Sequence, residues 1–192
     1  IMVGVGGVGL LISMISFEGA MGKLVGAILF SLAMFVVTTF GLYLITGLST
    51  RILTMGVKNF WSLPVSLLFN VIGIGILAGL VILSHIEIHE VATVMMDTKL
   101  GDDGWVINSF SSGILCGIMI GLSVILPKYT AKKELSASVG VIFPVFVFVF
   151  CGFDNSLANI FYMLMCNEMT WAMVGYCFVS MVGNLIGGVM VS

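Results

Sequence analysis

The chain has 192 residues, of which 60% are hydrophobic and only 8% are charged, and its net charge is −2. A soluble domain carries about a quarter charged residues, so this chain has too little polar surface to stay in water as a globule. The composition therefore indicates an integral membrane protein. The chain has no basic tract that could bind phosphates, which argues against nucleic acid as a partner.

Six apolar runs are long enough to cross a lipid bilayer, which takes about 20 mainly apolar residues. In chain order they cover about residues 1–17, 21–46, 61–84, 105–127, 137–167 and 171–192. The chain begins at Ile1, already inside the first run, with no Met, basic segment or small-residue cleavage site. We therefore expect a single transmembrane domain over residues 1–192 whose ends are trimmed, rather than a signal peptide.

The charges between the runs predict the orientation in the membrane. Basic residues gather in the second and fourth connections: Arg51, Lys58, Lys128, Lys132 and Lys133. The third connection holds one lysine, Lys99, among acidic residues: Glu87, Glu90, Asp97, Asp102 and Asp103. Because basic loops stay in the cytoplasm, the second and fourth connections and both termini are predicted to be cytoplasmic.

Two runs are interrupted by small and polar residues. The second run passes from "AILFSLAMFVVTTFG" into "LYLITGLSTRIL", and the fifth from "IFPVFVFVFCG" into "FDNSLANIF". The third and sixth runs carry "GIGILAG" and "VGNLIGG". Three spans followed by three spans place the two halves in opposite orientations. The matching interruptions therefore predict two inverted three-helix repeats around a transport path.

Each interruption frees backbone groups that hydrocarbon cannot satisfy. A broken helix is tolerated only where it lines a cavity or is buried in protein. The freed amides and the positive end of a restarting helix would attract an anion. The alternative is an ordinary kink in a packed helix. If the helices do restart, the candidate N-caps are the polar residues of the two breaks: Ser49, Thr50, Asp154, Asn155 and Ser156.

The stretch "GFDNSLANIFYM", residues 152–163, resembles the fifth-helix signature of the formate/nitrite transporter family, G-F-E-H-S-x-A-N-M. "GAMGKLVGAILFSL" is similar to the family's sequence leading into the second helix, "LITG" to the loop within it, and "VGNLIGG" to the sixth helix. The resemblance implies an all-α, aquaporin-like membrane protein of six transmembrane helices with interrupted second and fifth helices. It further implies a homopentamer in the cell (inner or plasma) membrane, with one pore per subunit.

The resemblance also implies a function, the passage of small monovalent anions or their conjugate acids: formate, nitrite, hydrosulfide, acetate and lactate. Thr46 falls on the family's threonine in the second-helix loop, and Lys99 lies near a lysine of the external vestibule. Phe30 and Phe148 fall on the external constriction. The apolar inner constriction maps to Met34, Leu44, Ile45 and Ile120, and the polar fifth-helix residues of the pathway are Asp154, Asn155, Ser156 and Asn159.

One departure concerns the centre of the motif. The family's histidine falls on Asn155, and the glutamate before it falls on Asp154. An imidazole can exchange a proton with a substrate near neutral pH, whereas an amide can only donate a hydrogen bond to an anion, as Thr46 can from the other side. Two routes stay open: a neutral acid protonated in the vestibule, or an anion whose lost hydration is replaced by these donors and the freed amides.

Other classes of function are weaker on the sequence. A channel for a small neutral solute such as urea is the alternative, because an amide also suits an uncharged solute. The segment "HIEIHE", residues 85–90, could bind zinc, but polar residues are expected in an external connection. We predict no metal site, no cofactor and no enzymatic activity, since no nucleophile with a base and no metal cluster at ligand spacing is found.

Overall fold

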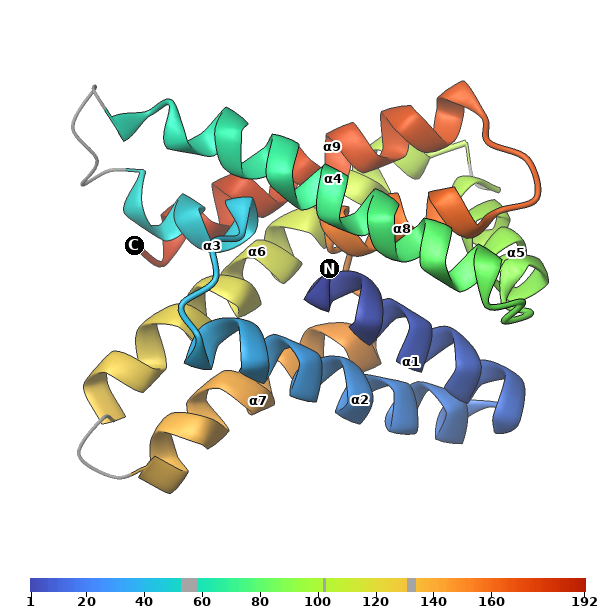
Figure 1. The fold of residues 1–192 in the computed structure, drawn as a ribbon. Helices are drawn as coiled ribbons and strands as arrows, with labels where there is room; N and C mark the ends of the chain where they lie inside the picture. Colours follow the sequence, from blue (N-terminus) through green and yellow to red (C-terminus); the bar gives the residue numbers. More distant parts are fainter. Residues whose placement is uncertain (53–58, 102, 131–133) are drawn as a thin grey trace.

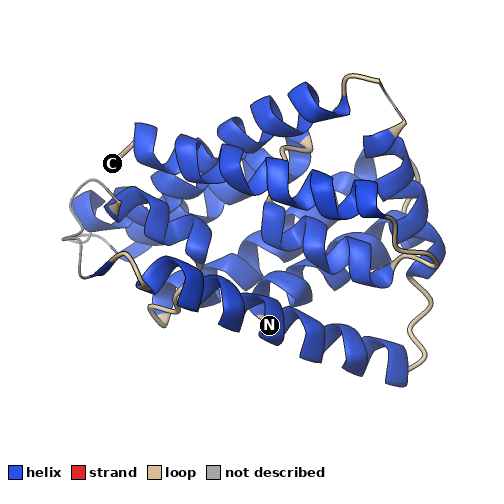
Figure 2. Ribbon diagram, turned by 90° about the horizontal axis from the view of Figure 1, so that it is seen from above, coloured by secondary structure: helices blue, strands red, loops and turns tan. Residues whose placement is uncertain are grey.

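The computed structural model describes residues 1–52, 59–101, 103–130 and 134–192, which are helical apart from short connections and contain no β-strand (Figure 2). Four charged residues used to predict the orientation lie outside the described residues: Lys58, Asp102, Lys132 and Lys133.

The described elements follow one another as α1 (Met2–Ser16), α2 (Ala20–Thr39), α3 (Ile45–Leu48), the 3₁₀ turn η1 (Ser49–Arg51), α4 (Ser62–Leu83), α5 (His89–Leu100), α6 (Trp105–Thr130), α7 (Glu134–Cys151), α8 (Ser156–Met165) and α9 (Trp171–Met190). Neighbours pack in the order α1 on α2, α2 on α7, α7 on α6 and α6 on α9. In Figure 1, α1, α2 and α7 gather along one side of the molecule and α4 and α9 along the other.

The short helix α8 lies at the centre of this arrangement. It contacts α1, α4, α5 and α9 (Figure 1). All of its residues except Met163 and Leu164 are buried. The polar stretch that begins α8 is therefore surrounded by protein, as the cost of unpaired backbone groups in hydrocarbon requires.

Long apolar helices confirm a multi-pass membrane protein. By length and composition, α2, α4, α6 and α9 can each cross a membrane. The α7–α8 pair forms a fifth candidate span, bent by 51° at its break. The remaining apolar helix, α1, has 15 residues, fewer than the roughly 20 that a full crossing takes.

One helix is not predicted from the sequence. Residues 85–104 are expected only as a polar connection, but α5 occupies most of it. Ile88, Ala92 and Met96 are completely or almost completely buried, which gives α5 a one-sided apolar stripe at a spacing of four residues. That spacing is present in the sequence, but the charged residues around it make the segment look like a polar connection.

Glycines let α6 and α9 approach closely. A Cβ added at Gly113 would lie 2.7 Å from the Ser180 carbonyl oxygen, and one at Gly183 would lie 2.5 Å from that of Phe110. The atoms that the added Cβ would meet belong to the backbone of the facing helix, so they could not move aside easily. The close approach allows a side chain of α9 to reach the backbone of α6.

Candidate pore site

The two interrupted runs end their first helix in the same way. Gly41 follows α2 and Gly152 follows α7, with φ values of +62° and +78° that favour glycine. In each case the amide after the glycine bonds back to the carbonyl five residues earlier: Leu42 to Val37 at 2.9 Å, and Phe153 to Phe148 at 2.8 Å. Both helices thus end in a Schellman motif, which turns the chain out of the helix at matching points of the two runs.

After the second break, α8 restarts with a side-chain cap. Asn155 is its N-cap, and the Oδ1 atom accepts hydrogen bonds from the amides of Leu157 and Ala158, at 3.0 and 3.3 Å. An N-cap from this polar stretch is predicted by the sequence, and Asn155 is the one of the three candidates that fills the position.

A second asparagine, Asn184 of α9, holds the same break. Its Nδ2 donates to the carbonyl oxygens of Asp154, at 2.7 Å, and Gly113, at 2.9 Å. Its Oδ1 accepts from the amide of Ser156, at 2.9 Å. Asn184 is fully buried, so it satisfies three backbone groups that no water reaches.

The first break is held by an equivalent asparagine from another helix. Asn70 of α4 accepts from the amide of Ile45 and donates to the carbonyl oxygen of Tyr43, both at 3.0 Å. Asn184 bridges the corresponding carbonyl and amide of the second break, those of Asp154 and Ser156. The two breaks thus share one design, in which a glycine ends the helix and an amide from the next long helix clamps the restart.

The predicted N-cap of the first break is wrong. The helix restarts at Ile45 with Leu44 in the cap position, whose side chain cannot accept a hydrogen bond. Ser49 and Thr50 lie one turn further on, and their hydroxyls donate back to the carbonyl oxygens of Thr46 and Gly47. Asn70 accepts from the amide of Ile45, the first helical residue, so this clamp serves a different amide from those that an N-cap side chain would serve.

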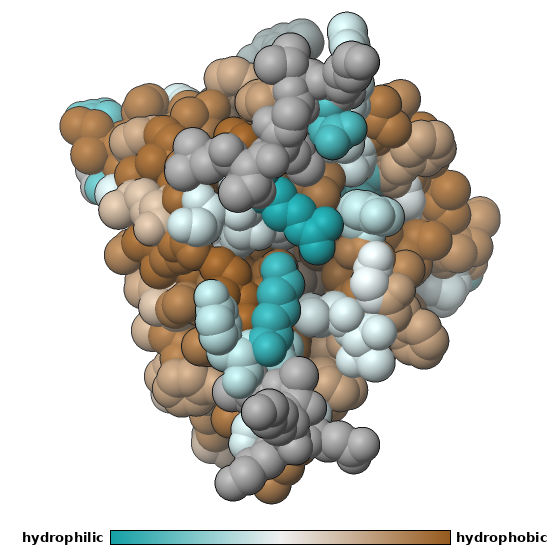
Figure 3. All heavy atoms as spheres, turned by 90° about the vertical axis from the view of Figure 1, so that its left-hand side faces the viewer, coloured by the Kyte–Doolittle hydropathy of each residue, from teal (hydrophilic) through white to brown (hydrophobic). Residues whose placement is uncertain are grey.

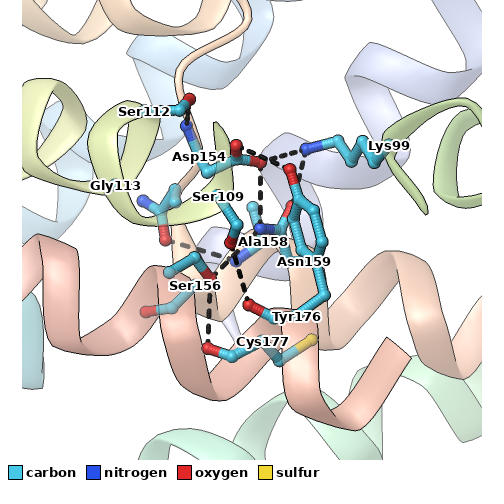
Figure 4. A network of polar contacts seen from close by, with 12 residues as sticks. Lys99, Ser109, Ser112, Gly113, Asp154, Ser156, Ala158, Asn159, Tyr176 and Cys177 are labelled. Carbon is cyan, nitrogen blue, oxygen red and sulfur yellow. Dashed lines mark hydrogen bonds and ion pairs between the residues drawn. The ribbon is translucent and has the colours of Figure 1, made fainter. Parts of the chain in front are cut away.

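A buried carboxylate, Asp154, organises the polar contacts beside the second break (Figure 4). Its Oδ1 pairs with the ammonium of Lys99 and accepts from Asn159 at 3.1 Å. Its Oδ2 accepts from the Tyr176 hydroxyl at 2.8 Å, and its amide donates to the Ser112 hydroxyl at 3.0 Å. Each atom of this residue that can form a hydrogen bond at the break therefore has a partner from another helix.

Lys99 comes to this network from α5. Besides Asp154, its ammonium contacts the Oδ1 of Asn159 at 2.9 Å and lies 5.6 Å from the centroid of the Tyr176 ring. The side chain retains 20% exposure. Lys99 is thus partly open to a cavity while its charge is compensated by Asp154, which favours keeping both charges at this depth.

Three polar side-chain atoms near the breaks are buried and have no hydrogen-bond partner. They are Thr46 Oγ1, Asn155 Nδ2 and Ser156 Oγ. None of the three residues is more than 3% exposed. An unpaired buried polar group costs about 1–3 kcal/mol, so their presence together indicates a place where a ligand or water supplies the missing partner.

A cavity of about 410 Å³ opens beside the second break. It is named the outer cavity, and the one beside the first break the inner cavity, after the orientation predicted from the sequence. Asn155 and Asn159 line it, together with the lysines Lys23 and Lys99. The aromatic residues Phe30 and Phe148 also line it, with ring centroids 5.8 Å apart in an edge-to-face arrangement at 83°. Gly6 of α1 makes room for this pair, because a Cβ there would lie 2.9 Å from the Phe30 ring.

An inner cavity of about 360 Å³ lies beside the first break. Met34, Leu44 and Ile120 line it, and Arg51 and Lys128 supply its positive charge. Figure 3 shows this end of the molecule, where hydrophilic residues meet in the middle of a largely apolar face. The cavity is apolar deep inside and basic at its rim, which suits the approach of an anion.

Most of the predicted site residues line one of the two cavities, whereas Thr46, Asp154 and Ser156 lie at the breaks and line neither. Ile45 is the exception among the expected inner residues, because it is buried without lining either cavity. The sequence analysis misses Tyr176, Asn70 and Asn184. The two asparagines had a signal, since each is an amide inside an otherwise apolar run, whereas nothing in the sequence places the Tyr176 hydroxyl beside Asp154.

A helical membrane protein with two clamped breaks, both contacting α9, and a cavity beside each of them has the architecture of a channel or transporter. Comparison with known proteins gives the same class and makes it specific. The family model described as Formate/nitrite transporter matches residues 1–192. The chain therefore belongs to the formate/nitrite transporter family.

Two solved structures are similar to this one. An "FNT family ion channel" superposes with a TM-score of 0.83 at 19% sequence identity, covering 98% of this chain and 82% of the other. A "Pentameric formate channel with formate bound" superposes with a TM-score of 0.75 at 22% identity, covering 97% and 90%. At these identities the likeness shows a shared fold. No curated protein matches the sequence.

Proposed function

We propose that the protein passes small monovalent anions or their conjugate acids across a membrane, through one pore per protomer. The substrate class comprises formate, nitrite, hydrosulfide and short monocarboxylates. Family membership and the likeness to a channel described with bound formate support an anion over the neutral-solute alternative, urea. No described contact favours urea in particular.

The observation that carries this proposal is the set of unpaired donors at the two breaks. Asn155 lines the outer cavity, and Thr46 lies between Leu44 and Gly47, which line the inner one. A passing anion would find a side-chain donor beside each cavity. Such donors replace part of the hydration that an ion loses in an apolar constriction, where an unpaired charge is very costly.

The remaining predicted residues take their roles from this path. Phe30 and Phe148 would form the external constriction. Lys99 would hold positive charge in the external vestibule, fixed there by Asp154 and Asn159. The hydroxyl of Ser156 would add a third donor near the centre, besides those of Thr46 and Asn155. The inner constriction would be formed by apolar side chains: Met34, Leu44, Ile45 and Ile120.

The proposed architecture is aquaporin-like, with six spans in two inverted three-helix repeats and with α1 as the first span. The matching glycines and asparagine clamps of the two breaks support this symmetry. The likeness to a pentameric channel supports a homopentamer, for which we propose a location in the inner or plasma membrane. The basic residues Arg51 and Lys128 at the inner cavity favour cytoplasmic termini, because this rim would then face the cytoplasm.

The test is transport by purified protein in liposomes. Uptake of formate, nitrite, hydrosulfide and urea is measured with and without an imposed pH gradient, against empty liposomes. We expect uptake of the anions and none of urea. Anion flux that ignores the gradient indicates passage of the anion itself, and flux that follows it indicates the neutral acid. Urea flux without anion flux would overturn the proposal.

A further inference from the structure

The amide of Asn155 has a fixed orientation. Its cap partners are the backbone N–H groups of Leu157 and Ala158, which can only donate, so the atom that faces them must be the carbonyl oxygen. The Nδ2 atom then has to face the other way, where it is buried and has no partner. Rotating the amide by 180° would place N–H groups against N–H groups and lose both cap hydrogen bonds.

This orientation determines what the centre of the path can offer a substrate. Nδ2 has two hydrogens to donate and no capacity to accept. The nearby carboxylate is already engaged, because both oxygens of Asp154 are bonded to Lys99, Asn159 and Tyr176. The unpaired hydroxyls of Thr46 and Ser156 can donate or accept. An imidazole in the same place could present a donor or an acceptor and could exchange its proton. The capped amide can only donate, and it cannot exchange a proton.

We infer that Asn155 is a specificity-determining residue, which presents fixed N–H donors to the path and selects small oxyanions over anions that accept hydrogen bonds less strongly. This inference rests on the proposed function and deepens it. The two N–H bonds of an amide diverge, so a formate or nitrite ion accepts from one of them through an anionic oxygen, which makes a strong hydrogen bond. Hydrosulfide has one sulfur, a weaker acceptor of hydrogen bonds. No proton is exchanged at this point, so the oxyanion crosses it in the form in which it arrives.

Two substitutions separate the donors from the cap. Asn155→Asp keeps a strong N-cap and nearly the same shape, but it replaces the outward donors by an acceptor oxygen. Asn155→Ser also keeps a good N-cap, removes the two N–H donors and adds no charge. Because the cap survives in both, α8 is expected to keep its position, which thermal unfolding of the purified variants in detergent would check.

The measurement is uptake of formate, nitrite and hydrosulfide by liposomes at pH 7. Asn155→Asp is expected to lose at least about tenfold in formate and nitrite flux, as losing a hydrogen bond to a charged group suggests. Asn155→Ser is expected to lose oxyanion flux more than hydrosulfide flux, so that the formate-to-hydrosulfide ratio falls. A change in this ratio is not expected from a defect in folding, which would lower both fluxes together.

Asn167→Asp serves as the matched control. It makes the same change of amide to carboxylate at an exposed residue after α8, which lines neither cavity, and it should conduct like the parent. A parent that conducts anions while Asn155→Ser keeps its flux and its ratio overturns the inference and leaves the proposed function standing. If the parent conducts no anion, the proposed function itself is wrong. Equal losses in Asn155→Asp and Asn167→Asp assign the effect to added charge and also overturn the inference.

Discussion

At the scale of single residues, the chain tolerates a local cost at the place where transport is proposed. Burying Thr46 Oγ1, Asn155 Nδ2 and Ser156 Oγ without partners lowers stability, because each unpaired group loses its hydrogen bonds to water. Elsewhere near the breaks the backbone groups are satisfied by Asn70 and Asn184. Local departures of this kind are typical of functional sites.

Thr46→Val tests the donor of the first break. Valine has the same shape but no hydroxyl, so packing is retained while a hydrogen bond to the anion is lost. We expect formate flux in liposomes to fall by roughly tenfold, with a small gain in thermal stability because a buried unpaired group is removed. Unchanged flux would show that the substrate does not contact this hydroxyl.

Asn155→His tests the missing imidazole. An unperturbed imidazole has a pKa of about 6.5, and its protonated form attracts an anion. Flux of formate should therefore rise as the pH falls through this value and decrease above it, whereas the parent should show no such step. The check is the pH profile of flux without an imposed gradient. A profile parallel to that of the parent would contradict the position assigned to this side chain.

At the scale of elements, the clamps explain how two broken helices are stable inside the protein. Each restart is held by an amide from the next long helix, α4 or α9. The second clamp depends on the close approach of α6 and α9, since Asn184 also bonds to the carbonyl of Gly113. Helix packing and the geometry of the break are therefore coupled.

Asn184→Ala tests this coupling. The substitution leaves three buried backbone groups without a partner, so we expect a loss on the order of 3 kcal/mol. For a chain of this size, that corresponds to a melting temperature lowered by roughly 5–10 °C. The control is Asn167→Ala, on the exposed connection after α8, which should melt like the parent. Equal melting temperatures for all three proteins would rule out the clamp.

Gly187→Ala tests the close packing itself. A Cβ at this position would overlap the carbonyl oxygen of Ile114, and overpacking costs about 1–3 kcal/mol. Gly75→Ala in α4 makes the same chemical change where no atom lies within 4 Å of the added carbon. It should be neutral or slightly stabilising, because alanine favours a helix. Thermal unfolding of the two variants side by side gives the comparison.

At the scale of the whole molecule, the Lys99–Asp154 pair connects α5 to the second break. The two residues are 55 positions apart, and α5 has its apolar stripe buried on the same side. Tyr176 of α9 and Asn159 of α8 join them. Three helices therefore meet at one carboxylate, beside the wall of the outer cavity.

Lys99→Met tests this connection. Removing the lysine leaves a buried carboxylate without its counter-charge, which typically costs 3–5 kcal/mol and should lower the melting temperature accordingly. Adding Asp154→Asn removes the remaining charge and should recover most of the loss. A double variant that is no more stable than Lys99→Met alone would mean that the charge pair does not hold these helices together.

Much of this arrangement could be predicted from the sequence, for reasons that differ between residues. The long apolar runs and their interruptions depend on composition and glycines such as Gly41 and Gly152, which act locally. The pairing of Lys99 with Asp154 could not be predicted, because it depends on how α5 packs on α8. The clamp by Asn70 likewise acts across 25 residues. The N-cap predicted at Ser49 or Thr50 is wrong because the helix restarts earlier, at Ile45.

The position of Asn184 has a consequence for the synthesis and membrane insertion of the protein. Synthesis proceeds from the N-terminus, so the second break emerges from the ribosome before the helix that satisfies it. Until α9 has inserted and packed, the amide of Ser156 and the carbonyl of Asp154 have no partner of this kind. The first break is completed earlier, since Asn70 follows it directly on α4. Insertion of α9 would therefore be the event that completes the second break and gives its exposed backbone groups their partners.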